Sequence, residues 1–210
     1  MPLPSPERRE MKLSCPVILA SASPRRKELL SGMGIAFTVI PAEVEELSPS
    51  GNCPAAEMVR LNACLKADAV ARHNPGALVL GSDTVVVCGG RIFGKPHSRE
   101  DAVAMLKNLS GRTHQVMSGV SLRFGKCGLD HSFTEISQVV FKPLTDASIR
   151  EYMALVNVMD KAGAYAIQEH SELILDRLDG SLSNVIGLPV EHLSRELIRL
   201  GKEFNFLLEP

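Results

Sequence analysis

The chain lacks any hydrophobic run long enough to cross a membrane, since none of its apolar stretches approaches 18 residues. It also lacks an excess of charge of either sign: 23 basic and 24 acidic residues give a net charge of -1. Dedicated nucleic-acid or membrane-surface binders normally carry a basic excess. We therefore expect no nucleic-acid and no membrane partner, although a small cationic pocket remains compatible with this balance.

Cysteine pairs at metal-binding or redox spacing are also missing. The five cysteines, at positions 15, 53, 64, 88 and 127, form no C-x-x-C motif and are odd in number. This pattern argues against a disulfide framework and against a structural zinc site. A reducing compartment, the cytoplasm, is the expected location.

The N-terminal segment superficially resembles a secretion signal, because basic residues precede the apolar stretch Cys15–Ala20. That stretch has only six residues and contains a proline, so it is too short for the hydrophobic region of a signal. We interpret residues 1–12 as a flexible tail and residues 13–210 as one domain.

Composition and patterning indicate a folded α/β domain. Apolar residues make up 45% and charged residues 22% of the 210 residues, close to the globular average. Short apolar runs alternate with amphipathic segments, without an internal repeat or an obvious linker. The pattern predicts a single domain with a mixed twisted sheet, with two lobes around a deep cleft.

Individual elements follow from periodicity and from turn residues. We expect strands over residues 16–20, 37–40, 77–80, 85–88, 91–93, 116–124 and 133–141. We expect helices from Pro24 to Gly34, from Ala55 to about His73, between Ser98 and Gly111, from Thr145 through Val156, and before Gly201. Ser23 and Thr145 are expected N-caps, and Ser98 with Asp101 matches a capping box.

The first candidate site is the segment Ser21–Lys27, where a strand leads into a helix whose first turn is densely cationic. Cations at a helix N-terminus oppose the macrodipole by about 0.3–1 kcal/mol each, so the placement makes sense if an anion binds there. The hydroxyls of Ser21 and Ser23 and the guanidinium of Arg25 or Arg26 would then meet a phosphate. Arginines on a solvated helix surface are the alternative.

The second candidate is Asp83 in Gly81-Ser82-Asp83-Thr84, between two strongly apolar strands. A carboxylate in such surroundings is costly to bury without a partner or a metal. Ligands of α/β sheets gather at strand ends, so a catalytic or metal-binding role is plausible there. The alternative is a turn aspartate that bonds its own backbone.

Two loops supply further candidates. Lys95, between Gly94 and Pro96, suits a phosphate contact, although exposed loop lysines are common. In the segment 160–168, small residues let the backbone approach a ligand, Lys161 supplies charge, and the Gln168 amide can read a base edge.

An acidic cluster follows the second predicted strand. Glu43, Glu45 and Glu46 can be a solvated face, or they can join Asp83 in holding a hard divalent cation through oxygen ligands. With the hydroxyls, cations and amide, this inventory matches a metal-dependent enzyme acting on a nucleoside triphosphate. Walker, G-x-G-x-x-G and G-x-S-x-G motifs are missing, which argues against P-loop, Rossmann and α/β-hydrolase enzymes.

Several motifs, in order, resemble those of the Maf family, the septum-formation-related nucleoside triphosphate pyrophosphatases. The matching segments are 20–30, 66–67, 81–86, 94–96, 105–116, 160–165 and 184–189. The resemblance implies hydrolysis of a nucleoside triphosphate to the monophosphate and pyrophosphate with Mg²⁺ or Mn²⁺. It also implies a fold similar to that of inosine triphosphatases and suggests a homodimer.

Residue roles carried over from the family are expectations of that resemblance. Asp83 matches the catalytic base and, with Glu46, a metal ligand. The positions linked to substrate choice are Arg25, Thr84 and Gln168. Phosphate binding is expected of Ser21, Ser23, Arg26, Lys95 and Lys161 from the residue patterns above, and the resemblance supports Lys95 and adds Lys66.

The residues at the three substrate-choice positions resemble the type acting on dTTP and UTP more than the type acting on 7-methyl-GTP. Ala166 and Glu169 stand where the family often has Gly, and Ser118 replaces the usual Thr, so the base pocket is expected to differ in detail. A pyrophosphatase of modified nucleotides and a non-catalytic nucleotide-binding cell-division regulator are the alternatives.

Overall fold

The computed structural model describes residues 12–48 and 53–207. All but Lys12 of the predicted tail, residues 1–12, lies outside the described residues. The strands are β1 (Val17–Leu19), β2 (Thr38–Val39), β3 (Leu78–Cys88), β4 (Arg91–Phe93), β5 (Thr113–Phe124), β6 (Leu129–Phe141) and β7 (Leu175–Asp179). The α-helices are α1 (Pro24–Gly32), α2 (Ala55–Ala71), α3 (Arg99–Leu109), α4 (Asp146–Leu155), α5 (Leu182–Ile186) and α6 (Val190–Glu203). Short 3₁₀ turns are η1 (Gly125–Cys127), η2 (Ala162–Ala164) and η3 (Ser171–Leu173).

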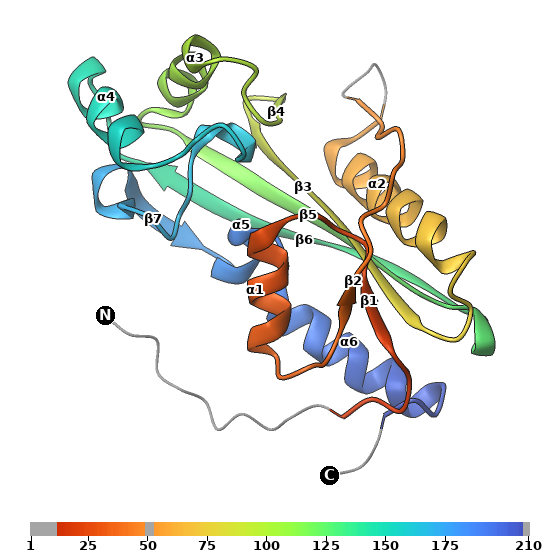
Figure 1. The fold of residues 1–210 in the computed structure, drawn as a ribbon. Coiled ribbons are helices and arrows are strands. Elements are labelled where there is room, and N and C mark those ends of the chain that lie inside the picture. Colours follow the sequence, from red (N-terminus) through yellow and green to blue (C-terminus); the bar gives the residue numbers. More distant parts are fainter. Residues whose placement is uncertain (1–11, 49–52, 208–210) are drawn as a thin grey trace.

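The strands form one mixed sheet in the order β2-β1-β3-β5-β6-β7, with β4 paired to β3 (Figure 1). β1 runs parallel to β2 and β3, whereas the pairs β3–β5, β5–β6 and β6–β7 are antiparallel. The predicted α/β domain with a mixed sheet is confirmed. Within the described residues, no helix is both long and apolar enough to span a membrane.

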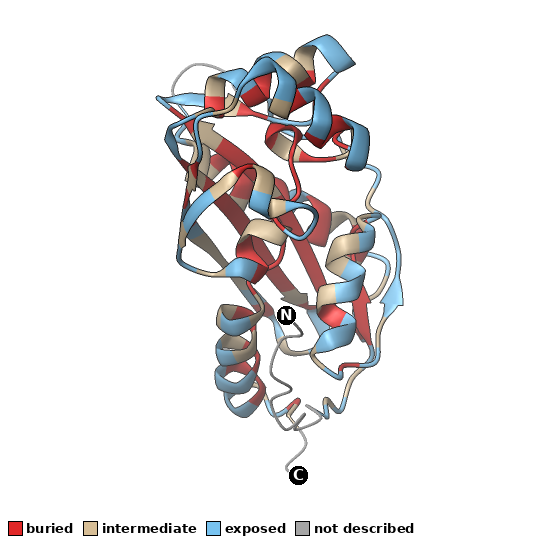
Figure 2. Ribbon diagram, turned by 90° about the vertical axis from the view of Figure 1, so that its left-hand side faces the viewer, coloured by how far each residue is buried: buried red, intermediate tan, exposed pale blue. Residues whose placement is uncertain are grey.

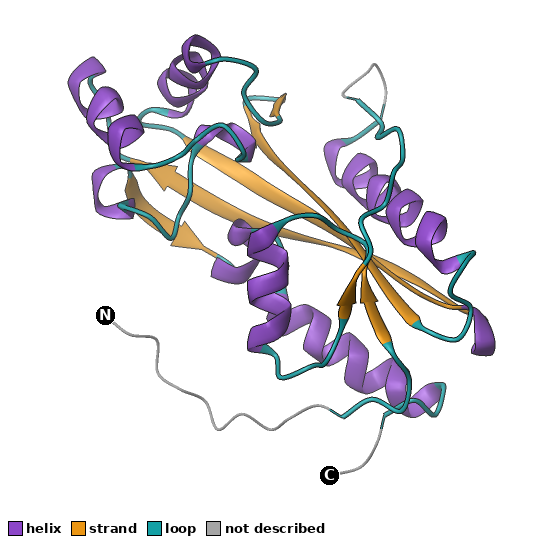
Figure 3. Cartoon of the chain, viewed as in Figure 1, coloured by secondary structure: helices purple, strands orange, loops and turns teal. Residues whose placement is uncertain are grey.

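Helices cover both faces of the sheet (Figure 3). α2 packs on one face, where Val79 and Val85 of β3 meet Ala67, Val59 and Met58 of the helix. On the other face, α1 and α6 cover one end of the sheet and α3 and α4 the other. Most residues of β3 and β5 are buried, while the helices expose their outer sides (Figure 2).

The prediction of two separate strands over residues 77–80 and 85–88 was wrong. Residues 81–84 are not a connection between two strands but the middle of one strand that runs unbroken from Leu78 to Cys88. β5 pairs with β3 from Val79 to Val87, and this ladder keeps the polar residues extended. Asp83 therefore lies in mid-strand rather than at a strand end. The two-residue turn into β4 at Gly89-Gly90 is confirmed.

Helix boundaries also differ in detail. α1 ends at Gly32, two residues before Gly34, and the Ser23 side chain makes no capping bond. Ser98 accepts from the Asp101 N–H as predicted, but the Asp101 carboxylate accepts from His97 instead of closing a capping box. α6 continues two residues past Gly201, to Glu203. The N–H groups of Phe206 and Leu207 then donate to the Gly201 carbonyl and close the end of the helix. β7 and α5 were not predicted.

Two glycines set the distance between α2 and the sheet. A Cβ on Gly119 of β5 would lie 2.2 Å from the carbonyl oxygen of Val59, and one on Gly81 of β3 would lie 2.3 Å from that of Ala63. Both obstacles are helix backbone, which cannot rotate away as a side chain can. The helix rests directly on the sheet only because these positions carry no side chain.

We expect Gly119→Ala to reduce the free energy of unfolding by about 1–3 kcal/mol or more, because the added methyl group must push α2 off the sheet. Denaturant unfolding measures the loss. Gly32→Ala in α1 is the matched control, since its Cβ would meet nothing within 4 Å and should change stability by less than about 1 kcal/mol. Equal stability of the two variants would contradict the proposed close packing.

Candidate active site

The middle of β3 has one open edge. β1 pairs with β3 only at Leu78–Leu80, and β4 pairs with it only at Val86–Cys88. In the described part of the chain, no strand pairs with residues 81–85 along that edge, although β5 occupies the other edge. Asp83 and Thr84 lie in this gap, so a ligand can approach their backbone and side chains between β1 and β4.

Asp83 is buried and meets α2 through both carboxylate oxygens. Lys66 Nζ lies 2.9 Å from Asp83 Oδ1, and the Asn62 side chain donates to Oδ2 at 3.0 Å. Asn62 and Lys66 are one helical turn apart and therefore share a face of α2. The close approach of α2 permitted by Gly81 brings both side chains onto the strand. Asp83 is thus a partnered, buried carboxylate rather than a turn aspartate.

Glu46 joins this group from the segment before α2. Its Oε1 lies 3.0 Å from Lys66 Nζ, so Glu46 and Asp83 share one ammonium group. The Glu46 side chain is 50% exposed, whereas that of Asp83 is 11% exposed. The site therefore has one sheltered carboxylate and one that borders solvent.

Arg26 forms a second group on the opposite face of β3. Its Nη2 donates to Thr84 Oγ1 at 3.0 Å, its Nη1 to Ser21 Oγ at 3.2 Å, and its Nε to the Gly187 carbonyl at 2.9 Å. Burial lowers the pKa of the Arg26 guanidinium, and the negative charges of Asp83 and Glu46 oppose that shift. Arg26 and Asp83 therefore bring opposite charges to the two faces of the same stretch of β3.

Arg25 forms a third group with the segment that precedes η2. Its Nη1 lies 2.9 Å from Asp160 Oδ2, and its Nη2 donates to the Asp160 carbonyl at 3.0 Å. Lys161 Nζ lies 2.9 Å from the other Asp160 oxygen. Burial raises the pKa of Asp160, but Lys161 and Arg25 outweigh it, so the pKa is below its ordinary value. Neither arginine of α1 extends freely into solvent.

The loop after β4 completes the surroundings of the open edge. The Gly163 N–H donates to the Gly94 carbonyl at 3.0 Å, which holds η2 against this loop. Lys95 follows Gly94 and is exposed. The segments at 21–26, 160–163 and 94–95 are therefore linked around the gap in β3.

Like the exposed Lys95 side chain, the side chains of Gln168 and Ser23 make no such contacts within the described residues. Gln168 is exposed in the turn after η2, and its side chain forms no hydrogen bond within the described residues. The Ser23 side chain is half-buried, and only its backbone N–H bonds into the site, to Ser21 Oγ at 3.3 Å. Neither side chain interacts directly with another predicted site residue within the described residues.

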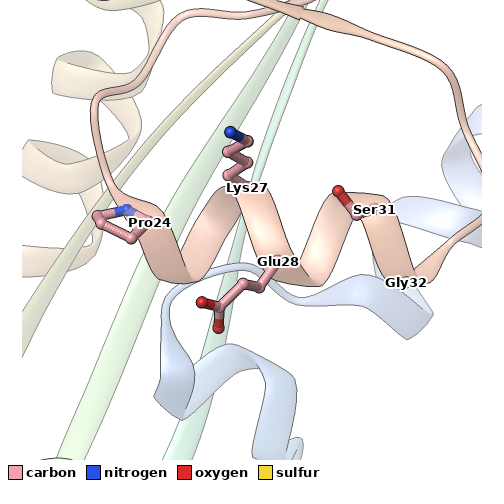
Figure 4. A pocket seen from close by; sticks show the side chains of 5 residues that line it. All are labelled: Pro24, Lys27, Glu28, Ser31 and Gly32. Atoms are coloured by element: carbon pink, nitrogen blue, oxygen red, sulfur yellow. The ribbon is translucent and has the colours of Figure 1, made fainter.

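Two surface hollows lie elsewhere. One, of about 600 Å³, is lined by Pro24, Lys27, Glu28, Ser31 and Gly32 (Figure 4). These residues lie on the side of α1 opposite Arg26, given 3.6 residues per turn. The other, of about 310 Å³, lies between Cys15 and Phe206. Neither hollow is lined by Asp83.

The carboxylates suit a hard cation that also binds phosphate. Among the described residues, no group of three His, Cys, Asp or Glu side chains could hold a metal ion by itself. Mg²⁺ usually takes one or two carboxylates plus substrate phosphates and waters, which does not require a third protein ligand. Asp83 and Glu46, joined through Lys66, fit that donor set.

Three residues have contacts in the site that were not predicted from the sequence. Asn62 and Asp160 each hold predicted site residues, and Ser118 Oγ lies 2.9 Å from Thr84 Oγ1. Ser118 also donates to the carbonyl of Asn184, which fastens α5 to β5, the strand paired with the one that bears Thr84. The sequence offers one indication for Asn62, because it is a polar residue between apolar ones, one helical turn before Lys66. Only the contact with β3 reveals its role.

His114 contacts Tyr165, the residue that directly follows η2. Its Nε2 lies 3.0 Å from the Tyr165 hydroxyl, and its ring packs edge-on against Phe141 and Tyr165. Burial lowers the pKa of His114 to about 4. This residue of the matching segment 105–116 is therefore a neutral core histidine.

Comparison with known proteins identifies the family. A family model described as Maf-like protein matches residues 16–200. The chain belongs to the Maf family. A dTTP/UTP pyrophosphatase of Akkermansia muciniphila is 47% identical over 186 residues, covering 89% of this chain and 97% of that protein. One of Bacillus velezensis is 43% identical over 189 residues, covering 90% and 96%.

Solved structures are more distant from this Maf protein. The nucleoside-triphosphatase / dITP/XTP pyrophosphatase of Mycobacterium abscessus overlays with a TM-score of 0.43 at 12% identity, covering 90% of this chain and 98% of that one. The Ham1 protein of Staphylococcus aureus overlays with a TM-score of 0.41 at 17% identity, covering 60% and 71%.

We expect acid to destabilise the protein through His114. The unfolded histidine, with a pKa near 6.5, takes up a proton that the buried ring resists until about pH 4. The unfolded state thus binds more protons between these values, and stability falls by about 3 kcal/mol as pH decreases through this window. The contribution is fully present above the unfolded pKa.

His114→Gln removes the titrating imidazole and places a neutral amide beside the Tyr165 hydroxyl. Urea unfolding at pH 7 and pH 4 should show a smaller acid loss in this variant than in the wild type, by about 3 kcal/mol. His73→Gln, at an exposed position after α2, is the control that should leave the loss unchanged. Identical acid losses in the wild type and His114→Gln would refute the assignment.

Proposed function

We propose that this Maf protein hydrolyses dTTP and UTP to the nucleoside monophosphate and pyrophosphate with a divalent cation. The supporting observation is the buried Asp83 on the open edge of β3, held by Lys66 and Asn62. The names of relatives that are 41–47% identical point to the same substrates.

Asp83 is the proposed base that orients or deprotonates the attacking water. Its two oxygens each accept one hydrogen bond from α2, and each carboxylate oxygen has a second lone pair for a water or a cation. The fixed pairing holds the carboxylate in one orientation, which general-base catalysis requires. The water would attack phosphorus in line with the departing pyrophosphate.

The cations around the gap are proposed to neutralise the triphosphate. Arg26 and Lys66 lie inside the site, and Lys161 and Lys95 border it from the η2 and β4 loops. Such preorganised charges stabilise negative charge that develops on the phosphates. Asp83 and Glu46 would hold Mg²⁺ or Mn²⁺ together with phosphate oxygens, and the metal would supply Lewis-acid stabilisation of the same charge.

Substrate choice is proposed to depend on Arg25, Thr84 and Gln168. The Thr84 hydroxyl already contacts Arg26, Ser118 and the Gly187 carbonyl, so we propose that it acts by positioning Arg26. The exposed Gln168 amide offers a donor and an acceptor, the pair that uracil and thymine require. Ala166 and Glu169, which border Gln168 closely in the chain, would shape the entrance for the base.

A homodimer and a cytoplasmic location complete the proposal, on the basis of the family resemblance. Size-exclusion chromatography with light scattering tests the first.

A nucleotide panel with Asp83→Asn tests the activity. We expect the wild type with Mg²⁺ to release pyrophosphate from dTTP and UTP faster than from GTP, 7-methyl-GTP or modified pyrimidine triphosphates. Asp83→Asn should lose at least about a hundredfold in kcat, because the base is gone, while nucleotide binding by calorimetry persists. Asp179→Asn, paired with Arg177 on β7, is the matched control.

Three results would contradict the proposal. Binding of dTTP without pyrophosphate release by the wild type would favour the non-catalytic alternative. A preference for 7-methyl-GTP or for a modified nucleotide would favour the other enzyme classes. Near-native activity of Asp83→Asn would exclude this residue as the base.

We expect Gln168→Ala to change the ranking of nucleotides. The ratio of kcat/KM for dTTP and UTP to that for CTP should fall about ten- to a hundredfold, because loss of a hydrogen bond to the base leaves a partner unsatisfied at a cost of about 1–3 kcal/mol. The metal concentration for half-maximal rate should stay the same. Gln138→Ala, at an exposed position of β6, serves as the control. An equal loss with every nucleotide would count against base recognition.

A further inference from the structure

Asn62 is a buried polar residue whose side chain is fully engaged by the protein. It is only 2% exposed, on the face of α2 that meets β3. Its amide makes three hydrogen bonds: two with the Leu47 backbone and one with the Asp83 carboxylate. A carboxamide has two N–H donors, and here both donate, so Asn62 has no donor left for a substrate.

The two bonds to Leu47 form a fork. The Leu47 N–H donates to Asn62 Oδ1 at 2.7 Å, and Asn62 Nδ2 donates to the Leu47 carbonyl at 3.2 Å. A planar amide bound at both ends fixes the position and the orientation of the backbone it holds. Leu47 directly follows Glu46, so the fork also fixes the point from which the Glu46 side chain extends.

Other contacts hold this segment weakly. The Leu47 side chain is 43% exposed, so burial does not anchor the loop there. Glu46 reaches Lys66 at 3.0 Å, but the Glu46 side chain is half exposed, so solvent screens this ion pair. The Asn62 fork is therefore the main directional contact between residues 46–47 and α2.

The third bond connects this fork to the proposed base. Asn62 Nδ2 also donates to Asp83 Oδ2 at 3.0 Å, while Lys66 holds Oδ1. One rigid amide thus spans the Leu47 backbone and the Asp83 carboxylate. Lys66, with its flexible stem, supplies charge to both acids but does not define their orientation.

We propose that Asn62 is a positioning residue that sets the geometry of Glu46 relative to Asp83. This inference rests on the proposed pyrophosphatase activity. Asn62 contributes by holding the two carboxylates where a nucleotide and its cation would meet them, and it does not touch the substrate. Its loss should therefore reduce kcat more than it changes KM for the nucleotide.

Asn62→Ala is the primary variant. We expect kcat for dTTP to fall about ten- to a hundredfold, as misplacement of catalytic groups by about 1 Å can cost, with KM changing by less than about threefold. The Leu47 amide, measured by NMR hydrogen exchange, should exchange at least about tenfold faster because its acceptor is gone. This exchange measurement does not depend on activity.

Val70→Ala controls for loss of stability. Val70 is buried in the same helix, against Ile18 and Val79, and lies outside the site. It should lower the melting temperature while kcat and Leu47 exchange stay close to the wild type. If Val70→Ala, at a matched loss of melting temperature, reduced kcat as much as Asn62→Ala, the positioning role would be overturned.

A double-mutant cycle with Glu46→Gln tests the route of the effect. If Asn62 acts partly by placing Glu46, Asn62→Ala should reduce kcat by a smaller factor in the Glu46→Gln background than in the wild type. Multiplicative losses in the double variant would refute this route.

The two proposals fail in different ways. A wild type that releases no pyrophosphate from any nucleotide would end the proposed function, whereas Leu47 exchange would still report on the fork. An active wild type with unchanged Leu47 exchange or unchanged kcat in Asn62→Ala would end the positioning role alone.

Discussion

The contact between α2 and the middle of the sheet is the constraint on which the site depends. Gly81 and Gly119 have no Cβ, so the helix backbone lies directly on β3 and β5. At that distance Lys66 reaches Asp83 and supplies the opposite charge without which a buried carboxylate would be costly. A helix held farther away by methyl groups would leave Asp83 without its two partners. The close packing of α2 on the sheet therefore gives the buried Asp83 carboxylate its two partners.

The second requirement is an interrupted sheet edge. β1 ends beside Leu80, and the antiparallel β4 ends beside Val86, so the strand that carries Asp83 and Thr84 is accessible between them. Successive residues of a strand point to opposite faces. Asp83 therefore belongs to the α2 side and Thr84 to the Arg26 side. The open edge lets one ligand meet both, and the charge interactions of Arg26 with Asp83 and Glu46 across β3 are consistent with such a shared site.

Much of this arrangement could be predicted from local patterns. The amphipathic period of α2, the glycine turn before β4 and the long alternating strands β5 and β6 are properties of neighbouring residues, and the structure agrees with them. The break predicted at residues 81–84 was wrong because polar residues with a glycine are typical of turns in isolation. In the protein, β5 pairs along that whole stretch and keeps it extended.

The amino-acid sequence by itself determined the chemistry available to this protein: one acid in an apolar run, arginines at a helix start, and family motifs from residue 20 to 189. It also determined the helices and strands whose hydrophobic period is strong. Only the tertiary structure decided which charges meet. Arg25 pairs with Asp160, 135 positions away, and Asn62 joins Leu47 to Asp83. Such pairings depend on how helices pack on a sheet. Neither the spacing of motifs nor the composition shows directly which side chains that packing brings together.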